Sequence, residues 1–173
     1  MKRLFSKSLV KNIYIAIFFA IFIALNIMII YLAAENGEQS TQTSNSVGEV
    51  VATAADSIGI HVDKNSEAFK NFIRKFFGHF SLFFFTSLNG VLSIIFLKNN
   101  PQMKRIVAYA FLGYGLILAI VTEVIQIFAG SRNGNFIDVL IDYLGYAIPM
   151  GIYLALSFFI YRKSRDNVNY IEV

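Results

Sequence analysis

The sequence predicts an all-α membrane protein, folded as a single domain over residues 1–173, that crosses the bilayer four times. Of these residues 56% are hydrophobic and only 15% are charged, whereas soluble domains carry roughly 25% charged residues. About 20 apolar residues, rising about 1.5 Å each, cross a hydrocarbon core of roughly 30 Å. Four apolar runs are long enough, at residues 13–34, 76–97, 106–128 and 136–161. The absence of cysteine excludes disulfides, thiolate metal sites and cysteine nucleophiles.

The first apolar run, residues 13–34, has Asn26 as its only strongly polar interruption. Because basic residues precede it, a cleaved signal peptide is the alternative interpretation. The apolar part of a signal peptide is only about 7–15 residues long, and Leu32, Ala33 and Ala34 make a poor cleavage site. We therefore expect this run to remain as a membrane anchor.

Residues 35–75 form a predicted extracellular segment between the first and second spans. Its first part, ENGEQSTQTSNS at residues 35–46, is polar and low in complexity, and we expect it to be flexible. Apolar residues then recur at helical spacing between Val47 and Ile58, which indicates a short amphipathic helix. The same pattern returns between Phe69 and Phe77, where we expect the chain to lie on the membrane surface before entering the second span. A helix that merely caps the bundle fits the same pattern.

The distribution of basic residues predicts the orientation. Ten of the fifteen Lys and Arg residues precede the first run, connect the second to the third, or follow the fourth. The positive-inside rule then places both termini in the cytoplasm, with residues 35–75 and 129–135 outside. Because these charges stand at helix ends, the net charge of +4 reflects membrane topology. We expect the lipid bilayer, and not a nucleic acid, to be the partner.

Polar and ionisable side chains stand near the predicted outer ends of the last three runs. Each such group in hydrocarbon costs at least a few kcal/mol, and those that occur usually face a bundle interior or a watery cavity. Helical rise places them at similar depth, so we expect them to share one polar site. The set consists of Lys75, His79, Glu123, Gln126, Arg132, Asp138 and Asp142.

This residue set suggests a division of roles. His79, Glu123 and Asp142 are the candidate catalytic residues, because an imidazole beside a carboxylate can exchange protons near neutral pH. The candidates for substrate binding are Lys75, Gln126, Arg132 and Asp138. No cofactor is expected, although several carboxylates and a histidine could hold a divalent cation. P-loop, GxSxG, HExxH and CxxC motifs are absent.

Two structural alternatives remain open for these residues. Asp138 and Asp142 near a helix start are also favoured by the helix dipole, so capping could explain their presence, Asp138 above all. Arg132 could neutralise a carboxylate in a bidentate pair, within a network that only fastens the third span to the fourth. Residues 133–135, Asn-Gly-Asn, are interpreted as a turn and nothing more.

Two stretches resemble the VanZ-like family of small bacterial membrane proteins. They are RKFFGHFSLFFF at residues 74–85 and EVIQIFAGSRNGNFIDVLIDYLG at residues 123–145. The polar Ser/Thr/Gln stretch after the first span fits as well. The resemblance implies a bacterial cell membrane and a link to glycopeptide resistance of the teicoplanin type, without supplying a mechanism. The family's polar and charged motif positions fall on the seven residues named above.

The sequence leaves two hypotheses of function. The first is an enzyme or substrate-handling site for a lipid-linked cell-wall precursor or envelope lipid at the outer leaflet, with Glu123 or His79 as the base. In it Arg132 binds phosphate or carboxylate, and Asp138 and Asp142 orient His79 or hold a cation. The second is a non-enzymatic scaffold or partner-binding protein whose ion pairs lock the bundle. A transporter is disfavoured, because four spans without an internal repeat are few for a transporter fold unless the protein oligomerises. The sequence does not predict the oligomeric state.

Overall fold

The computed structural model describes residues 2–97, 100–130 and 134–169, and every regular element within them is a helix. Four segments are long and apolar enough to cross a membrane, which confirms the predicted all-α, four-span architecture. These segments are Ser8–Ala33, Glu67–Phe96, Pro101–Phe128 and Phe136–Arg162. Each of the four predicted apolar runs falls on one of them.

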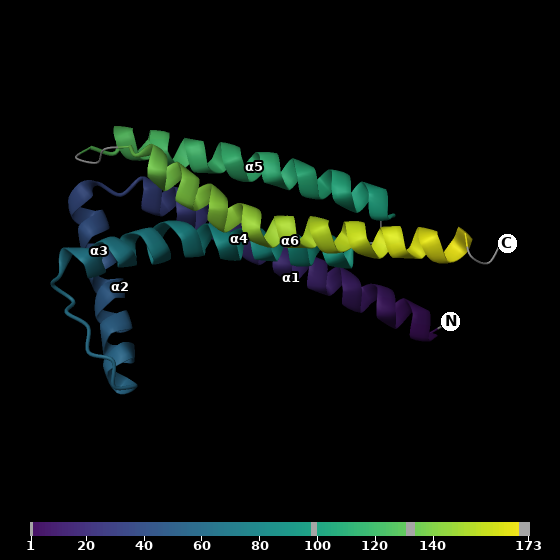
Figure 1. Ribbon diagram of the computed structural model, residues 1–173, viewed down its shortest axis with the longest axis horizontal. Coiled ribbons are helices and arrows are strands. Elements are labelled where there is room, and N and C mark those ends of the chain that lie inside the picture. The colour runs from purple at the N-terminus through teal and green to yellow at the C-terminus, as the bar shows by residue number, and fades with distance from the viewer. Residues whose placement is uncertain (1, 98–99, 131–133, 170–173) are drawn as a thin grey trace.

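The second of these segments is built from three consecutive pieces, α3, η1 and α4, where η1 is π-helical. Figure 1 shows the long helices running along one another, with α2 lying across one end of the bundle. The start of α1 and the end of α6 lie at the opposite end. In chain order the elements are α1 (Lys2–Ala33), α2 (Gly37–Ser57), α3 (Glu67–Phe72), η1 (Ile73–Ser81), α4 (Leu82–Phe96), α5 (Pro101–Phe128) and α6 (Phe136–Asn169).

Helix α4 packs against α1, α5 and α6 and so forms the middle of the bundle. Near the α2 end the core includes Phe83 of α4 and Tyr146 of α6, whose ring occupies the space beside Gly115 of α5. The first span is tied to the third by a hydrogen bond that the Tyr114 hydroxyl donates to Asn26. Large apolar side chains stay exposed around the outside, as a surface facing lipid requires.

The polar segment after α1 is helical, which corrects the expectation that residues 35–46 are flexible. Helix α2 begins at Gly37, and Asn36 caps it: the Asn36 side chain accepts from the Gln39 amide, and the Gln39 side chain accepts from the Asn36 amide. Such a capping box satisfies two amides that a helix start leaves open. On the bundle side, buried Gly48 of α2 faces Phe69 and Ile73. The low-complexity composition of residues 35–46 therefore gave no indication of the capped helix that packs on the bundle.

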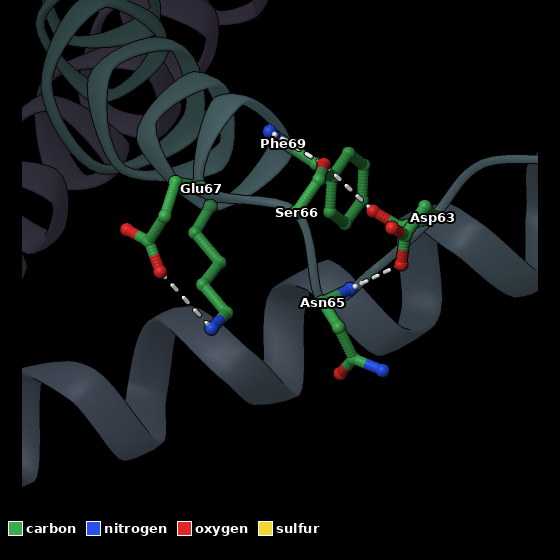
Figure 2. A network of polar contacts seen from close by, with 6 residues as sticks. Asp63, Asn65, Ser66, Glu67 and Phe69 are labelled. Atoms are coloured by element: carbon green, nitrogen blue, oxygen red, sulfur yellow. Dashed lines mark hydrogen bonds and ion pairs between the residues drawn. The ribbon is translucent and has the colours of Figure 1, made fainter.

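The helix that contains the second apolar run starts before that run, at Glu67, whereas the run itself starts at residue 76. Ser66 caps α3 by accepting from the Phe69 amide at 3.3 Å, while its hydroxyl donates to the Asp63 carbonyl at 2.9 Å (Figure 2). The Asp63 carboxylate in turn accepts from the Asn65 amide. The helix is continuous from this cap into the bundle, so the segment from Phe69 to Phe77 belongs to the same helix as the second apolar run.

Candidate functional site

His79, the histidine of the candidate site, lies in the π-helical segment η1. Such segments occur frequently at functional sites, because the wider turn redirects side chains. The His79 residue is 5% exposed, and its Nδ1 lies 3.0 Å from Oδ1 of Asp142, which is 1% exposed. The two residues come from η1 and α6, so this contact joins the second span to the fourth inside the bundle.

Glu123 adds a second buried carboxylate from α5, at 5% exposure. Its Oε2 accepts a hydrogen bond of 2.8 Å from the backbone amide of Asn135. Asn135 also caps α6, because its side-chain oxygen accepts from the Ile137 amide at 3.0 Å. The residue interpreted from sequence as part of a turn therefore also orients Glu123 at the junction of α5 and α6.

His79, Glu123 and Asp142 meet in one cluster. One nitrogen or oxygen from each lies within 4.8 Å of the others, and all three residues are buried. Glu123 Oε1 and Asp142 Oδ2 have no hydrogen-bond partner among the described residues, and the same holds for Oδ1 of Asp138, which is also buried. Buried carboxylate oxygens without partners are costly, so this cluster is poorly explained as packing alone.

Two glycines allow the backbones to approach closely enough for the cluster to form. Gly145 of α6 lies against the backbone of Phe80, the neighbour of His79, so tightly that a Cβ atom would collide with the Phe80 carbonyl. Gly145 follows Asp142 by about one helical turn. At the α5–α6 connection, a Cβ on Gly134 would come within 2.6 Å of the Ile127 side chain. Both glycines therefore set the distance between elements that carry site residues.

Two hollows that share part of their walls open beside the cluster. The inner recess has a volume of about 60 Å³ and reaches Asp142, which is room for a few water molecules. The outer pocket is larger, about 700 Å³, and reaches Asp138 and Asn135. The residues shared by both walls are Ser40, Ser44, Arg74, His79 and Gln126. Helix α2 supplies the two serines, so the segment predicted to be flexible forms a wall of the site.

The predicted site residues fall into three groups. Gln126 lines both hollows and Asp138 lines the outer pocket, on the same side of the bundle as the catalytic candidates. Lys75 lies elsewhere, along a groove with Phe72, Phe76 and Ile141. Arg132 is outside the described residues.

Sequence reasoning missed Arg74, which lines both hollows in the part of the site where Lys75 was expected. A spacing of four residues places Lys75 and His79 on one face of an α-helix, but η1 is π-helical. The wider turn changes which neighbour of His79 shares its face. Nothing in the sequence alone indicated this local change of helix type.

Four membrane-crossing helices around a buried cluster of ionisable residues define a multi-pass membrane protein with a polar site inside its bundle. The chain belongs to the VanZ/LLP1 family, whose model matches residues 17–159 and so covers most of the chain. The resemblance seen in the sequence is thereby confirmed. No curated protein and no solved structure matches the chain.

Proposed function

We propose that this VanZ-family protein binds or acts on an envelope lipid or lipid-linked cell-wall precursor at the outer leaflet of the bacterial membrane. We further propose that this activity contributes to resistance against glycopeptides of the teicoplanin type. The observation that carries the proposal is the buried His79–Asp142 pair, which lines a hollow together with Arg74. The pair offers acid–base chemistry, and Arg74 offers a cation for an anionic group.

The chemistry of the pair follows from its hydrogen bond. With Asp142 ionised, Nδ1 of His79 donates to Oδ1 over the 3.0 Å separation. This holds the imidazole in the tautomer whose Nε2 carries a lone pair, and the carboxylate stabilises the ring if Nε2 takes up a proton. His79 is then the base, and Asp142 is the residue that orients it.

The outer pocket suits the polar end of an amphiphile. Its volume of about 700 Å³ falls within the range of small-molecule sites. Lys70, Arg74, Glu67 and Asp138 line it, and Lys70 already pairs with Glu67 at 3.4 Å. Arg74 can pair with phosphate or carboxylate oxygens. Apolar chains attached to such a headgroup can remain in the surrounding lipid, because the outside of the bundle is apolar. A lipid-linked molecule, with a polar headgroup and apolar chains, fits a polar pocket beside an apolar surface better than a fully soluble substrate does.

The outer-leaflet location rests on the positive-inside rule. The cluster lies near the end of the bundle that carries α2, opposite the start of α1 and the end of α6 (Figure 1). Most Lys and Arg residues flank the spans at the latter end, which favours the cytoplasm for that end. The pocket then opens toward the outside of the cell.

A second candidate function is a scaffold whose buried polar contacts only lock the bundle. The observation in its favour is that Glu123 and Asp142 each form a contact between segments, through Asn135 and His79. This candidate predicts that removing either charge lowers the amount of folded protein. The substrate-handling function instead predicts lost activity at unchanged abundance.

The test compares envelope lipids and cell-wall precursors between cells that lack the chain and cells that express it. We expect at least one anionic lipid species to change in amount when the wild-type chain is present. Cells expressing Asp142→Asn at the same membrane abundance should resemble cells without the chain. Asp56→Asn, at an exposed carboxylate of α2 far along the chain from the site, serves as the matched control. Identical profiles in all four strains would contradict the proposal.

A further inference from the structure

We propose that His79, Glu123 and Asp142 bind a divalent metal ion of the Zn²⁺ class, with an open coordination position toward the inner recess. The inference goes beyond the proposed function and does not depend on it, because metal binding needs no envelope substrate. It rests on three independent features of the cluster: the spacing of the donor atoms, the buried oxygens without partners, and the chemical type of the donors.

The spacing of the donors fits one small ion. One donor atom from each of the three residues lies within 4.8 Å of the others, and His79 Nδ1 lies 3.0 Å from Asp142 Oδ1. An ion bound at Nδ1 would replace the proton that Nδ1 donates to Asp142 in the metal-free pair, because a ligating imidazole nitrogen must be deprotonated. Ligands of a tetrahedral zinc ion, each about 2.1 Å from the metal, lie about 3.4 Å apart. Donors on facing helices are a common way to build a metal site in a bundle.

The charge of the cluster calls for a cation. Glu123 Oε1 and Asp142 Oδ2 are buried oxygens without a hydrogen-bond partner among the described residues. Asp138 adds a third buried carboxylate close by. Within the described part of the chain, no lysine or arginine forms an ion pair with any of the three. Since buried charges in proteins are normally paired or bound to metal, a divalent cation would supply the missing partner.

The donor types select the metal. One imidazole and two carboxylates form a mixed nitrogen and oxygen set, as in three-ligand zinc sites that keep a fourth position open. Calcium and magnesium prefer oxygen ligands alone, and the chain has no thiolate to offer. The Asn135 amide holds Glu123 Oε2 and leaves Oε1 for the ion. Such outer hydrogen bonds orient the ligands of metal sites.

The experiment uses the full chain, purified in nanodiscs without a histidine tag and stripped of metal with a chelator. Zn²⁺ is added, and bound zinc is counted after gel filtration. Thermal unfolding is followed in parallel, because an ion that binds only the folded state raises its stability. We expect about one zinc ion per chain and a higher midpoint of unfolding.

Two variants and one control locate the ion. Glu123→Gln and Asp142→Asn should each weaken zinc affinity by about tenfold or more. His61→Gln removes an exposed histidine that lies 3.0 Å from Asp56 and should bind zinc as the wild type does. Co²⁺ then reports the ligands directly, since its visible spectrum in the wild type should lose intensity in His79→Gln. This spectral readout separates lost ligation from lost folding, which is monitored by helical circular dichroism.

Two results would overturn the inference. One is a wild-type chain that is folded yet holds substantially less than one zinc ion and gives no tetrahedral Co²⁺ spectrum. The other is zinc binding that persists in Asp142→Asn but disappears in His61→Gln, which would move the ion to the exposed pair. Either outcome leaves the envelope proposal standing, because that proposal is tested by lipid composition in cells.

Discussion

Gly145 of α6 lies directly against the backbone carbonyl of Phe80 in η1. This contact sets the separation of the two segments that carry Asp142 and His79. In Gly145→Ala the added methyl group forces α6 away from η1. Overpacking of this kind typically costs about 1–3 kcal/mol, so we expect a lower midpoint of thermal unfolding and a weakened His79–Asp142 contact.

Gly151→Ala is the control for this change, because it lies on the same helix and its added methyl group meets no atom within 4 Å. Alanine is the better helix former by about 1 kcal/mol, so Gly151→Ala should leave stability unchanged or raise it slightly. Equal effects of the two substitutions would mean that the close approach at Phe80 does not matter.

The buried His79–Asp142 pair should be energetically coupled, and the exposed His61–Asp56 pair should not. Both pairs have a separation of 3.0 Å between Nδ1 and Oδ1. They differ in burial and in sequence separation, because the buried pair joins η1 to α6 and the exposed pair is local. Removing one partner of a buried pair leaves an uncompensated group and typically costs about 3–5 kcal/mol. Exposed pairs contribute about 0–1 kcal/mol.

Double-mutant cycles measure this difference as a change in the free energy of unfolding. The cycle of His79→Ala and Asp142→Ala should give a coupling of about 1 kcal/mol or more. The cycle of His61→Ala and Asp56→Ala should give a coupling near zero. If both cycles gave the same coupling, burial would have no influence on the pair.

The sequence predicted the four spans because long apolar runs have few interpretations other than membrane helices. It also identified His79, Glu123 and Asp142, since ionisable residues stand out in such runs, and the structure brings them within 4.8 Å. The helical spacing between Val47 and Ile58 predicted the second half of α2. The sequence missed the first half, residues 37–46, because the signal there is a single capping box at Asn36 within a composition typical of disorder. Arg74, and not the predicted Lys75, lines the site because η1 is π-helical, and no residue pattern in the sequence indicated that type of helix.

Arg74 and Lys75 are adjacent residues of like charge, and only Arg74 lines the two hollows beside His79, which makes them a matched pair for testing the pocket. Both residues line the groove with Phe72 and Phe76. Arg74→Gln should reduce any effect of the chain on anionic envelope lipids by about tenfold, the order of one charge-assisted hydrogen bond of about 1.4 kcal/mol or more.

Lys75→Gln should leave that effect largely intact, because the charge it removes does not reach the pocket. Lipid composition in cells matched for membrane abundance provides the measurement. A loss of activity in Lys75→Gln with none in Arg74→Gln would reverse this assignment and restore the residue that helical spacing favoured.

The orientation of the bundle can be tested by labelling introduced cysteines, because the chain has none of its own. Thr53→Cys on exposed α2 should react with a membrane-impermeant maleimide added to intact cells. Gln102→Cys, exposed at the start of α5, should react only after the membrane is permeabilised. The opposite labelling pattern would place the pocket in the cytoplasm and remove the basis for an outer-leaflet substrate.

The most direct test of the buried cluster as a functional site is the teicoplanin susceptibility of cells expressing the wild type or Glu123→Gln at equal membrane abundance. Glu123→Gln keeps the size of the side chain and removes its charge. We predict that the wild type raises the minimal inhibitory concentration and that Glu123→Gln abolishes the increase. An unchanged increase in Glu123→Gln, or no increase with the wild type, would contradict the account.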